Sequence, residues 1–294
     1  MRILITGGTG FIGQALCPLL AQQGHQLVLW TRQLKPNLPV GVTDYVQQLD
    51  ELEPDSIQAV INLAGAGIAD QRWNEQRKKL LVDSRVNTTR QLVAWMAKQT
   101  LRPQVLVSAS AVGYYGEQGD AEITEATPPT PGFTHDLCAA WEAAALEAEA
   151  LDVRVCLVRT GVVLAPEGGS LKKMLPAFRF GLGGPLGEGK HWFPWIHRKD
   201  MARIYTWLLT HESAQGVYNA SAPEPVTNAD FTRLLGKALH RPTLLPMPEK
   251  VLKLLFGEMA DLLLVSDRML PERLMQEGFS FDYPQLDQAL KDLL

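Results

Sequence analysis

The sequence has few cysteines, no long apolar run and no large excess of either charge. Its three cysteines are widely separated, which argues against a disulfide framework and a cysteine-based zinc site. No run of about 18 apolar residues is present, so we expect no membrane-spanning helix. The 28 basic residues are outnumbered by 32 acidic ones, which leaves no basic excess for a nucleic-acid backbone. We therefore expect neither a membrane nor a nucleic acid as a partner.

The overall composition is that of a globular protein. Hydrophobic residues make up 46% of the chain and charged residues 20%, as is typical of folded domains. The start, MRILITGGTGFIG, contains no apolar segment of the length found in signal peptides, so we expect a cytoplasmic protein. The six histidines show no metal-ligand spacing, and we expect no metal site.

Apolar strands alternate with helical patterns over the first 160 residues. A helix should follow the first strand, and Pro18 should kink it because proline removes one hydrogen bond. This alternation predicts an α/β protein with a doubly wound parallel sheet, the Rossmann architecture. Strands are expected at 2–5, 26–31, 59–63, 105–108 and 154–159, and further helices at about 73–98 and 136–150.

The composition changes after residue 159. Residues 181–197 combine five glycines with three large aromatic residues, which predicts a loop or hairpin region whose aromatics either line a substrate or bury the loop. Helices are expected at 227–240 and 251–264. We predict a Rossmann domain at 1–240, with a substrate lobe from about residue 160, and a small helical C-terminal domain at 241–294.

Gly7, Gly10 and Gly13 form a GxxGxxG motif between the first strand and the first helix. Gly7 permits a tight turn, Gly10 lets the backbone approach a pyrophosphate, and Gly13 lets the helix pack close to the sheet. The alternative is a purely structural turn. The strand–turn–helix context favours dinucleotide binding.

The end of the second strand indicates which dinucleotide is bound. An acidic residue roughly 20 positions after the motif usually binds the ribose 2′-hydroxyl of NAD, but the first acidic residue of this chain is Asp44. Thr31 and Arg32 end the strand instead, and a guanidinium can pair with the 2′-phosphate of NADP. NADP is therefore the predicted cofactor, and the alternative for Arg32 is a solvated surface side chain.

Four segments resemble the extended short-chain dehydrogenase/reductase superfamily, the group of nucleotide-sugar epimerases and dehydratases. They are ITGGTGFIG at the start, VINLAGA at 60–66, VSASAVGYYG at 107–116 and FPWIHRKDMARI at 193–204. NLAG, SRVNTTRQL, RTGVVL and GLGGPLGEG look more narrowly like the atypical YfcH-like subgroup of epimerase-family proteins. Members of that subgroup end in a short helical domain, which is similar to the tail expected here.

The resemblance implies a set of contacts with NADP. Arg85 would lie on a helix that faces the cofactor, although a salt-bridged surface arginine is an equal alternative. The implied residues are listed in order from the pyrophosphate, past the 2′-phosphate and the adenosine side, to the nicotinamide side. They are Gly7, Gly10, Phe11, Ile12, Gly13, Thr31, Arg32, Leu63, Ala64, Gly65, Arg85 and Val163.

The catalytic Tyr-x-x-x-Lys pair of the superfamily is absent. None of the six tyrosines is followed by a lysine four residues later. Alignment on Trp141 and Glu142 places Thr134 at the tyrosine position and Cys138 at the lysine position. A threonine hydroxyl is too weak an acid to replace the tyrosine, and a cysteine has no fixed positive charge.

Three nearby residues are candidates to replace the missing pair. Ser110 lies at the strand end where the superfamily binds its substrate, and Tyr114 or Tyr115 could supply a phenol from the next turn. The alternatives are a hydroxyl that caps its own backbone and aromatic rings packed on the sheet edge. His197 is either a proton donor or a packed core residue.

Three functions remain open at this point. The leading one is an NADP-dependent oxidoreductase that transfers hydride to or from a small molecule of unknown identity. The second is a catalytically inactive, NADP-sensing regulator that acts through its helical tail. The third is a nucleotide-sugar epimerase, which the missing tyrosine base disfavours. Small residues in the helix around 137–148 could form the contact of a homodimer or an intramolecular contact.

Overall fold

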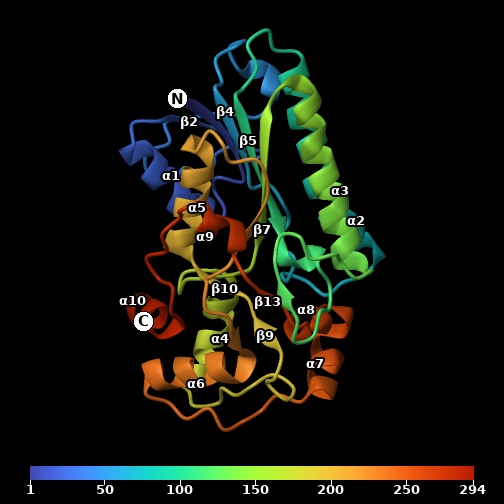
Figure 1. Cartoon of the computed structure of the whole chain (residues 1–294), viewed down its shortest axis with the longest axis vertical. Helices are drawn as coiled ribbons and strands as arrows, with labels where there is room; N and C mark the ends of the chain where they lie inside the picture. The colour runs from blue at the N-terminus through green and yellow to red at the C-terminus, as the bar shows by residue number, and fades with distance from the viewer.

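The computed structural model describes all 294 residues. Seven parallel strands form one sheet, in the order β11–β7–β5–β4–β1–β2–β3 (Figure 1). Strand β1 lies between β2 and β4, so the chain winds outward from β1 in both directions, and the predicted Rossmann architecture is confirmed. The strands are β1 (Arg2–Thr6), β2 (Gln26–Trp30), β3 (Asp44–Val46), β4 (Ala59–Asn62), β5 (Val105–Ala111), β7 (Arg154–Thr160) and β11 (Gly216–Ala220).

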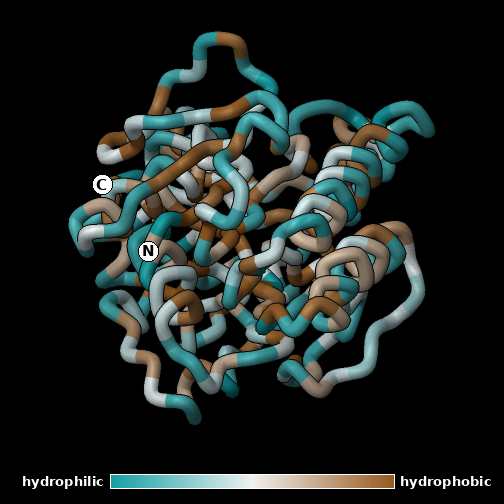
Figure 2. The backbone as a smooth tube through the Cα atoms, turned by 90° about the horizontal axis from the view of Figure 1, so that it is seen from above, coloured by the Kyte–Doolittle hydropathy of each residue, from teal (hydrophilic) through white to brown (hydrophobic).

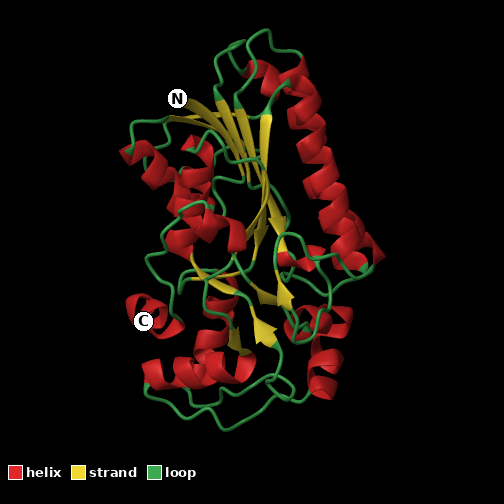
Figure 3. Ribbon diagram, viewed as in Figure 1, coloured by secondary structure: helices red, strands yellow, loops and turns green.

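Helices cover both faces of this sheet (Figure 3). Helices α1 (Gly13–Gln22) and α5 (Arg198–Thr210) pack together on one face, and α2 (Glu75–Ala97) and α3 (Phe133–Leu146) pack together on the other. Helix α1 runs through Pro18 from Gly13 to Gln22 without a break. The sheet is therefore shielded from solvent on both sides.

The side chains of each strand alternate between two cores. Ile3 and Ile5 of β1 pack in the core that contains Leu16 of α1, whereas Leu4 packs in the core that contains Leu92 of α2. Strands that are buried on both faces have continuous apolar sequences. Figure 2 shows many of the hydrophobic segments of the chain in the middle of the molecule.

A second lobe lies beyond the carboxyl ends of the strands (Figure 1). Its core contains Trp195, Phe231 and Leu171. The glycine-rich segment 181–197, expected as a loop or hairpin region, contains two short strands that pair with other parts of this lobe. The elements are β8 (Val162–Leu164), α4 (Gly169–Arg179), β9 (Trp192–Phe193), β10 (Trp195–His197), β12 (Val226–Thr227) and α6 (Asn228–Leu239).

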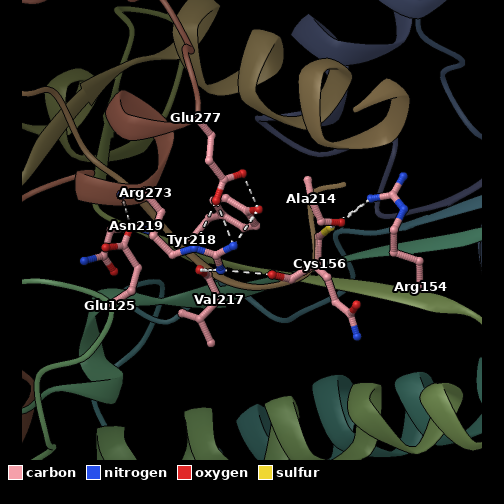
Figure 4. Close-up of polar contacts among 10 residues, drawn as sticks. Glu125, Arg154, Cys156, Ala214, Val217, Tyr218, Asn219, Arg273 and Glu277 are labelled. Carbon is pink, nitrogen blue, oxygen red and sulfur yellow. Dashed lines mark hydrogen bonds and ion pairs between the residues drawn. The ribbon is translucent and has the colours of Figure 1, made fainter. Parts of the chain in front are cut away.

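The C-terminal tail packs on the rest of the chain at three places. Strand β13 pairs with β6, helix α9 packs on β11, and helix α10 packs on α6. Arg273 of α9 donates to the carbonyl of Val217 and to the hydroxyl of Tyr218, which fixes the tail to the edge of the sheet (Figure 4). The remaining elements are β6 (Glu122–Ile123), α7 (Glu249–Phe256), α8 (Asp261–Leu264), β13 (Arg268–Met269), α9 (Glu272–Gln276), α10 (Leu286–Leu293) and the 3-10 helices η1 (Leu49–Glu51), η2 (Val112–Tyr114), η3 (Glu147–Leu151) and η4 (Gly257–Ala260).

The strands and the two long helices expected from the sequence are confirmed within a few residues at each end. The amphipathic helices α4 and α5 were not expected. Pro176 interrupts the pattern of α4, and α5 follows directly on the aromatic segment that indicated a loop. None of the helices combines the length and the apolar character needed to span a membrane.

Candidate functional site

The glycine motif forms a tight turn between β1 and α1. Gly7 has a φ of +66°, and a Cβ atom on it would lie 2.5 Å from the carbonyl oxygen of Leu63. A Cβ atom on Gly13 would lie 2.2 Å from the carbonyl oxygen of Gly8. The first glycine therefore lets the turn approach the end of β4, and the last lets α1 start directly against the turn.

The start of α1 offers free backbone donors. The amides of Phe11, Ile12 and Gly13 donate to no acceptor in the chain, and the first turn of α1 contains no acidic side chain. A Cβ atom on Gly10 would meet only the carbonyl oxygen of Gly7, at 3.0 Å. Free amides at a helix N-terminus bind anions. The turn thus fits a pyrophosphate, as the motif predicts.

A cleft lies over this turn. It has a volume of about 550 Å³, and opposite the glycine turn it is lined by Glu167 and Gly168, which follow β8, and by Arg198 at the start of α5. Phe11 lies against Gly168, where a Cβ atom would come within 2.4 Å of the Phe11 ring. Arg198 forms an ion pair with Glu167 at 3.1 Å. The sequence analysis missed both charged residues, although Arg198 belongs to a segment that it singled out.

The ends of β1, β4 and β5 are joined by hydrogen bonds through the buried side chain of Asn62. Its amide oxygen accepts from Thr6 Oγ1 at 2.7 Å, and its amide nitrogen donates to Thr89 and to Ser108. Thr6 Oγ1 in turn accepts from the backbone amide of Ala64. These bonds fix the path of the chain where β4 ends, so the loop of Leu63, Ala64 and Gly65 faces the glycine turn in a defined position.

Two predicted contacts, Arg32 and Val163, are not among the residues that line this cleft. Arg32 follows β2, is exposed, and forms no hydrogen bond or ion pair, while Thr31 Oγ1 accepts from the amide of Gln33. Val163 lies in β8 and is 9% exposed, next to the Gly169 backbone that also touches Phe11. Arg32 is thus free to bind a ligand at the edge where the strands end.

Arg85 is not the salt-bridged surface arginine that was the alternative. Its guanidinium donates to the carbonyl oxygens of Leu81 and Ala66, at 3.0 and 2.9 Å, and forms no ion pair with a carboxylate. A Cβ atom on Gly65 would lie 3.0 Å from Arg85 Cζ. The guanidinium therefore lies directly against the backbone at the end of β4.

Ser110 belongs to a buried network of charged residues. Its hydroxyl donates to Glu142 Oε1 at 2.6 Å, and Arg159 binds the same carboxylate through two hydrogen bonds of 2.8 Å. Burial by itself would lower the pKa of Arg159, but the hydrogen bonds and charge of Glu142 outweigh it and raise that pKa. The sequence analysis missed this pair, although an arginine within the apolar strand RVCLVRT is a signal for one.

The two candidate tyrosines lie in different environments. Tyr115 is completely buried and donates to Asn219 Oδ1 at 2.7 Å. Burial raises the pKa of its phenol to about 12. A buried phenol that already has an acceptor is a poor proton donor to a ligand, so the geometry argues against Tyr115.

Tyr114 is half-buried, and its hydroxyl forms no hydrogen bond within the chain. Its ring stacks on the Arg159 guanidinium, with 3.3 Å between the ring centre and Cζ. Thr134, at the superfamily's tyrosine position, lies against Gly113, where a Cβ atom would come within 3.0 Å of Thr134 Cβ. Tyr114 therefore directly follows the residue that packs against the superfamily's tyrosine position.

The aromatic segment and His197 have structural contacts. Trp195 is buried in the core of the second lobe, and Trp192 Nε1 donates to Asp120 at 3.1 Å. His197 is 1% exposed, stacks on Tyr283 and lies 3.2 Å from Asp292. These contacts favour the packed-core interpretation of His197.

Comparison with known proteins places this fold and site in a family. The profile of the "NAD dependent epimerase/dehydratase family" matches residues 3–221, and a "domain of unknown function (DUF1731)" matches residues 247–293. The mouse epimerase family protein SDR39U1 is 40% identical over 299 residues, which cover both chains completely. A chloroplastic SDR39U1 homologue of Arabidopsis thaliana is 38% identical, covering all of this chain and 87% of its own.

A solved structure is similar over its whole length. The crystal structure of human SDR39U1 (isoform 2) with NADPH has a TM-score of 0.92 and 39% sequence identity, and the match covers 100% of this chain and 99% of the human one. The ligand of that human protein is the reduced form of the cofactor that Arg32 predicts for this chain. By its fold, its glycine turn and these matches, the chain belongs to the NAD dependent epimerase/dehydratase family.

Proposed function

We propose that the protein is an NADP(H)-dependent oxidoreductase of the extended short-chain dehydrogenase/reductase type, acting on a small molecule. The observation that carries this proposal is the row of free amides at Phe11, Ile12 and Gly13, which opens on the cleft between the lobes. The unpaired Arg32 at the adjacent strand end supports the choice of NADP over NAD. The NADPH complex of the human relative supports it as well.

In this proposal the dinucleotide supplies the hydride, and the chain binds it and handles the proton. The α1 amides hold the pyrophosphate, and Arg32 with Thr31 holds the 2′-phosphate. Phe11 lines the cleft, and Val163 lies near it, because both residues contact Gly169. Tyr114 is the proton donor or acceptor, because its hydroxyl is the free one of the two candidate phenols. Ser110 keeps the end of β5 in place through Glu142.

Calorimetric titration with NADPH and NADH tests the cofactor assignment. Wild-type protein should bind NADPH at least about tenfold more tightly than NADH, and Arg32→Ala should abolish that preference. Lys35→Ala is the matched control, because Lys35 is also exposed and forms no ion pair. If neither nucleotide binds, or if Arg32→Ala keeps the full preference, the assignment is wrong.

The second candidate function is an NADP sensor that catalyses no reaction. The observation that favours it is a direct link between the loop after β4 and the tail. Arg72 donates to the carbonyl oxygens of Leu254 and Leu255, and Lys78 pairs with Glu258 at 2.6 Å. A change in the loop on cofactor binding would therefore reach α7.

Hydrogen exchange and turnover distinguish the two functions. A sensor should show altered amide exchange in α7 on NADPH binding and no NADPH oxidation with a panel of carbonyl compounds. Sustained oxidation with a single substrate would rule out the sensor. A nucleotide-sugar epimerase is the third candidate, and we rank it last because the tyrosine–lysine pair is absent.

Three further parts of the proposal concern organisation. We treat residues 241–294 as a C-terminal module, which the DUF1731 match at 247–293 supports. We place the protein in the cytoplasm, which its three free, buried cysteines support. We also keep a homodimer through the helix around 137–148 as a proposal, which the exposed Leu146 on that helix supports.

A further inference from the structure

Glu167 and Arg198 are the only charged side chains that line the cleft over the glycine turn. Glu167 lies between β8 and α4, and Arg198 is the first residue of α5. The two side chains form an ion pair, with 3.1 Å between Arg198 Nη2 and Glu167 Oε2. The cleft therefore contains one positive and one negative side chain, and they are bound to each other.

Arg198 lies at the start of α1, where the pyrophosphate is proposed to bind. Its Cζ is 5.3 Å from the centre of the Phe11 ring. The amide of Phe11 is one of the three in this turn that have no acceptor in the chain. An arginine binds phosphate oxygens through two parallel hydrogen bonds, which are strong because both partners are charged. Arg198 is therefore the cation that a pyrophosphate would meet in this cleft.

Glu167 is a weak partner for this arginine. The side chain of Glu167 is 63% exposed and that of Arg198 is 22% exposed, and an exposed ion pair contributes little stability. The pair is the only ionic or hydrogen-bonding contact of either side chain within the chain. A pyrophosphate offers more charge and more acceptor oxygens than one carboxylate does. Exchange of Glu167 for a pyrophosphate would thus lose little and gain a stronger partner.

We propose that Arg198 exchanges Glu167 for the pyrophosphate of the dinucleotide, so that Glu167 competes with the cofactor for Arg198 and limits the affinity of the site. The proposed function assigns the pyrophosphate to backbone amides alone, and this inference adds a side chain that binds it and a carboxylate that opposes binding. It rests on the proposed function, because it requires that the chain bind a dinucleotide at the α1 turn.

The experiment is a calorimetric titration of NADPH into purified full-length protein. Arg198→Gln should weaken NADPH binding by about tenfold, since it removes charge-assisted hydrogen bonds. Glu167→Gln should tighten binding by about fivefold, because the competitor for Arg198 is removed. These two opposite effects distinguish competition from damage to the fold, which would weaken binding in both variants. Thermal melting of each variant shows whether it is folded.

Two exposed ion pairs of the second lobe provide matched controls. Arg233→Gln breaks the 3.0 Å pair with Asp230, and Glu188→Gln breaks the 2.7 Å pair with Lys190. None of these four residues lines the cleft. Both control variants should therefore bind NADPH within about twofold of wild type.

The double variant tests whether Glu167 acts through Arg198. If the carboxylate competes for the guanidinium, Glu167→Gln should no longer tighten binding once Arg198→Gln is present. If the full gain persists in the double variant, Glu167 repels the phosphates directly and the exchange of partners is overturned.

NADH separates this site from the one proposed for Arg32. NADH contains the pyrophosphate but not the 2′-phosphate, so Arg198→Gln should weaken NADPH and NADH by the same factor. Arg32→Ala should weaken NADPH alone. An effect of Arg198→Gln on NADPH but not on NADH would overturn the assignment of Arg198 to the pyrophosphate.

Failure of the inference and failure of the proposed function give different results. If wild-type protein binds neither nucleotide, the proposed function fails and this inference fails with it. If wild type binds but Arg198→Gln binds as tightly as Arg233→Gln, only the role of Arg198 is overturned. If Arg198→Gln binds weakly but Glu167→Gln binds no more tightly than Glu188→Gln, the competition is overturned while the binding role of Arg198 stands.

Discussion

Two arginines lie next to α3, and only one of them has a carboxylate counter-charge in the chain. Arg159 is 4% exposed in its side chain and is neutralised by Glu142 through two hydrogen bonds. Arg85 donates only to backbone carbonyls. Arg159 belongs to β7 and Arg85 to α2. The first charge is balanced inside the fold, and the second is available to a ligand.

The difference separates structural polar groups from binding groups. A buried ion pair adds little stability compared with apolar packing, but removing one partner is costly because it strands the other charge. Arg159 and Glu142 therefore have to be kept together to hold α3 against β7. Arg85 has no such partner in the chain, which is consistent with the cofactor contact that the family resemblance implies.

Removal of the Glu142 charge should have the largest effect on stability. Glu142→Gln leaves the Arg159 guanidinium buried without a counter-charge, and it should lower the free energy of unfolding by about 3–5 kcal/mol. Urea denaturation measures this change.

A surface pair provides the control for this prediction. Glu147 pairs with Arg90 at 3.8 Å, with both side chains more than half exposed, so Glu147→Gln should cost less than about 1 kcal/mol. Replacing both buried partners, as Glu142→Leu with Arg159→Met, should recover a large part of the loss. A Glu142→Gln protein as stable as Glu147→Gln would show that the buried pair does not hold α3.

The architecture was predictable because its signals are local. The glycine motif, the apolar strands and the helix at 73–98 each follow from residues close together in the chain, and the structure confirms them. The two short strands in segment 181–197 have their partners elsewhere in the second lobe. Pairings between distant segments cannot be derived from a local pattern, and the contacts of the tail with β6, β11 and α6 were missed for the same reason.

The partners of the site residues were harder to predict than the residues themselves. Glu142 and Arg159 are 17 residues apart and meet only when α3 packs on β7. Tyr114 and Tyr115 are adjacent in the chain, and only the 3-10 turn η2 decides which phenol is buried. The salt bridge that was one alternative for Arg85 also depended on neighbours that the sequence does not specify. The residue types were visible in the sequence, whereas their neighbours were not.

Tyr115 and Tyr114 provide a second, smaller comparison, between a hydroxyl that has a hydrogen-bond partner and one that has none. Tyr115→Phe removes the donor to the buried Asn219 side chain and should cost about 1–3 kcal/mol of unfolding free energy. Tyr114→Phe removes a hydroxyl without a partner and should change stability by less than about 0.5 kcal/mol. Urea denaturation of both variants checks these values.

Turnover should respond in the opposite order. Once a substrate is found, Tyr114→Phe should lower kcat by about 100-fold or more, as expected for loss of a proton donor. Tyr115→Phe should keep most of kcat at a temperature where it is folded. If Tyr115→Phe alone abolishes turnover, the assignment of the two phenols has to be exchanged.

The same comparison can be made between two acidic residues. Glu142 has a counter-charge in Arg159, whereas Asp267 has none. Asp267 is 1% exposed, and neither of its carboxylate oxygens has a hydrogen-bond partner in the chain. Burial, followed by the nearby charge of Glu117, raises the pKa of Asp267 well above its usual range. In the folded protein Asp267 therefore keeps its proton to a higher pH than an exposed aspartate does.

The raised pKa makes the free energy of unfolding change with pH in a definite direction, which a pH series can test. Because the folded pKa is raised, the stability that the protonated form contributes is present below the unfolded pKa of about 3.9 and is lost as pH rises toward the folded pKa. As the pH rises above the unfolded pKa of about 3.9, wild type should lose stability relative to Asp267→Asn, which cannot ionise. Taking the difference at each pH cancels the other titrating groups. The matched control, Asp50→Asn, removes an exposed aspartate without an ion pair and should leave that difference flat. If Asp267→Asn runs parallel to wild type over this range, Asp267 is ionised in the folded chain, and a partner must then balance it as Glu142 balances Arg159.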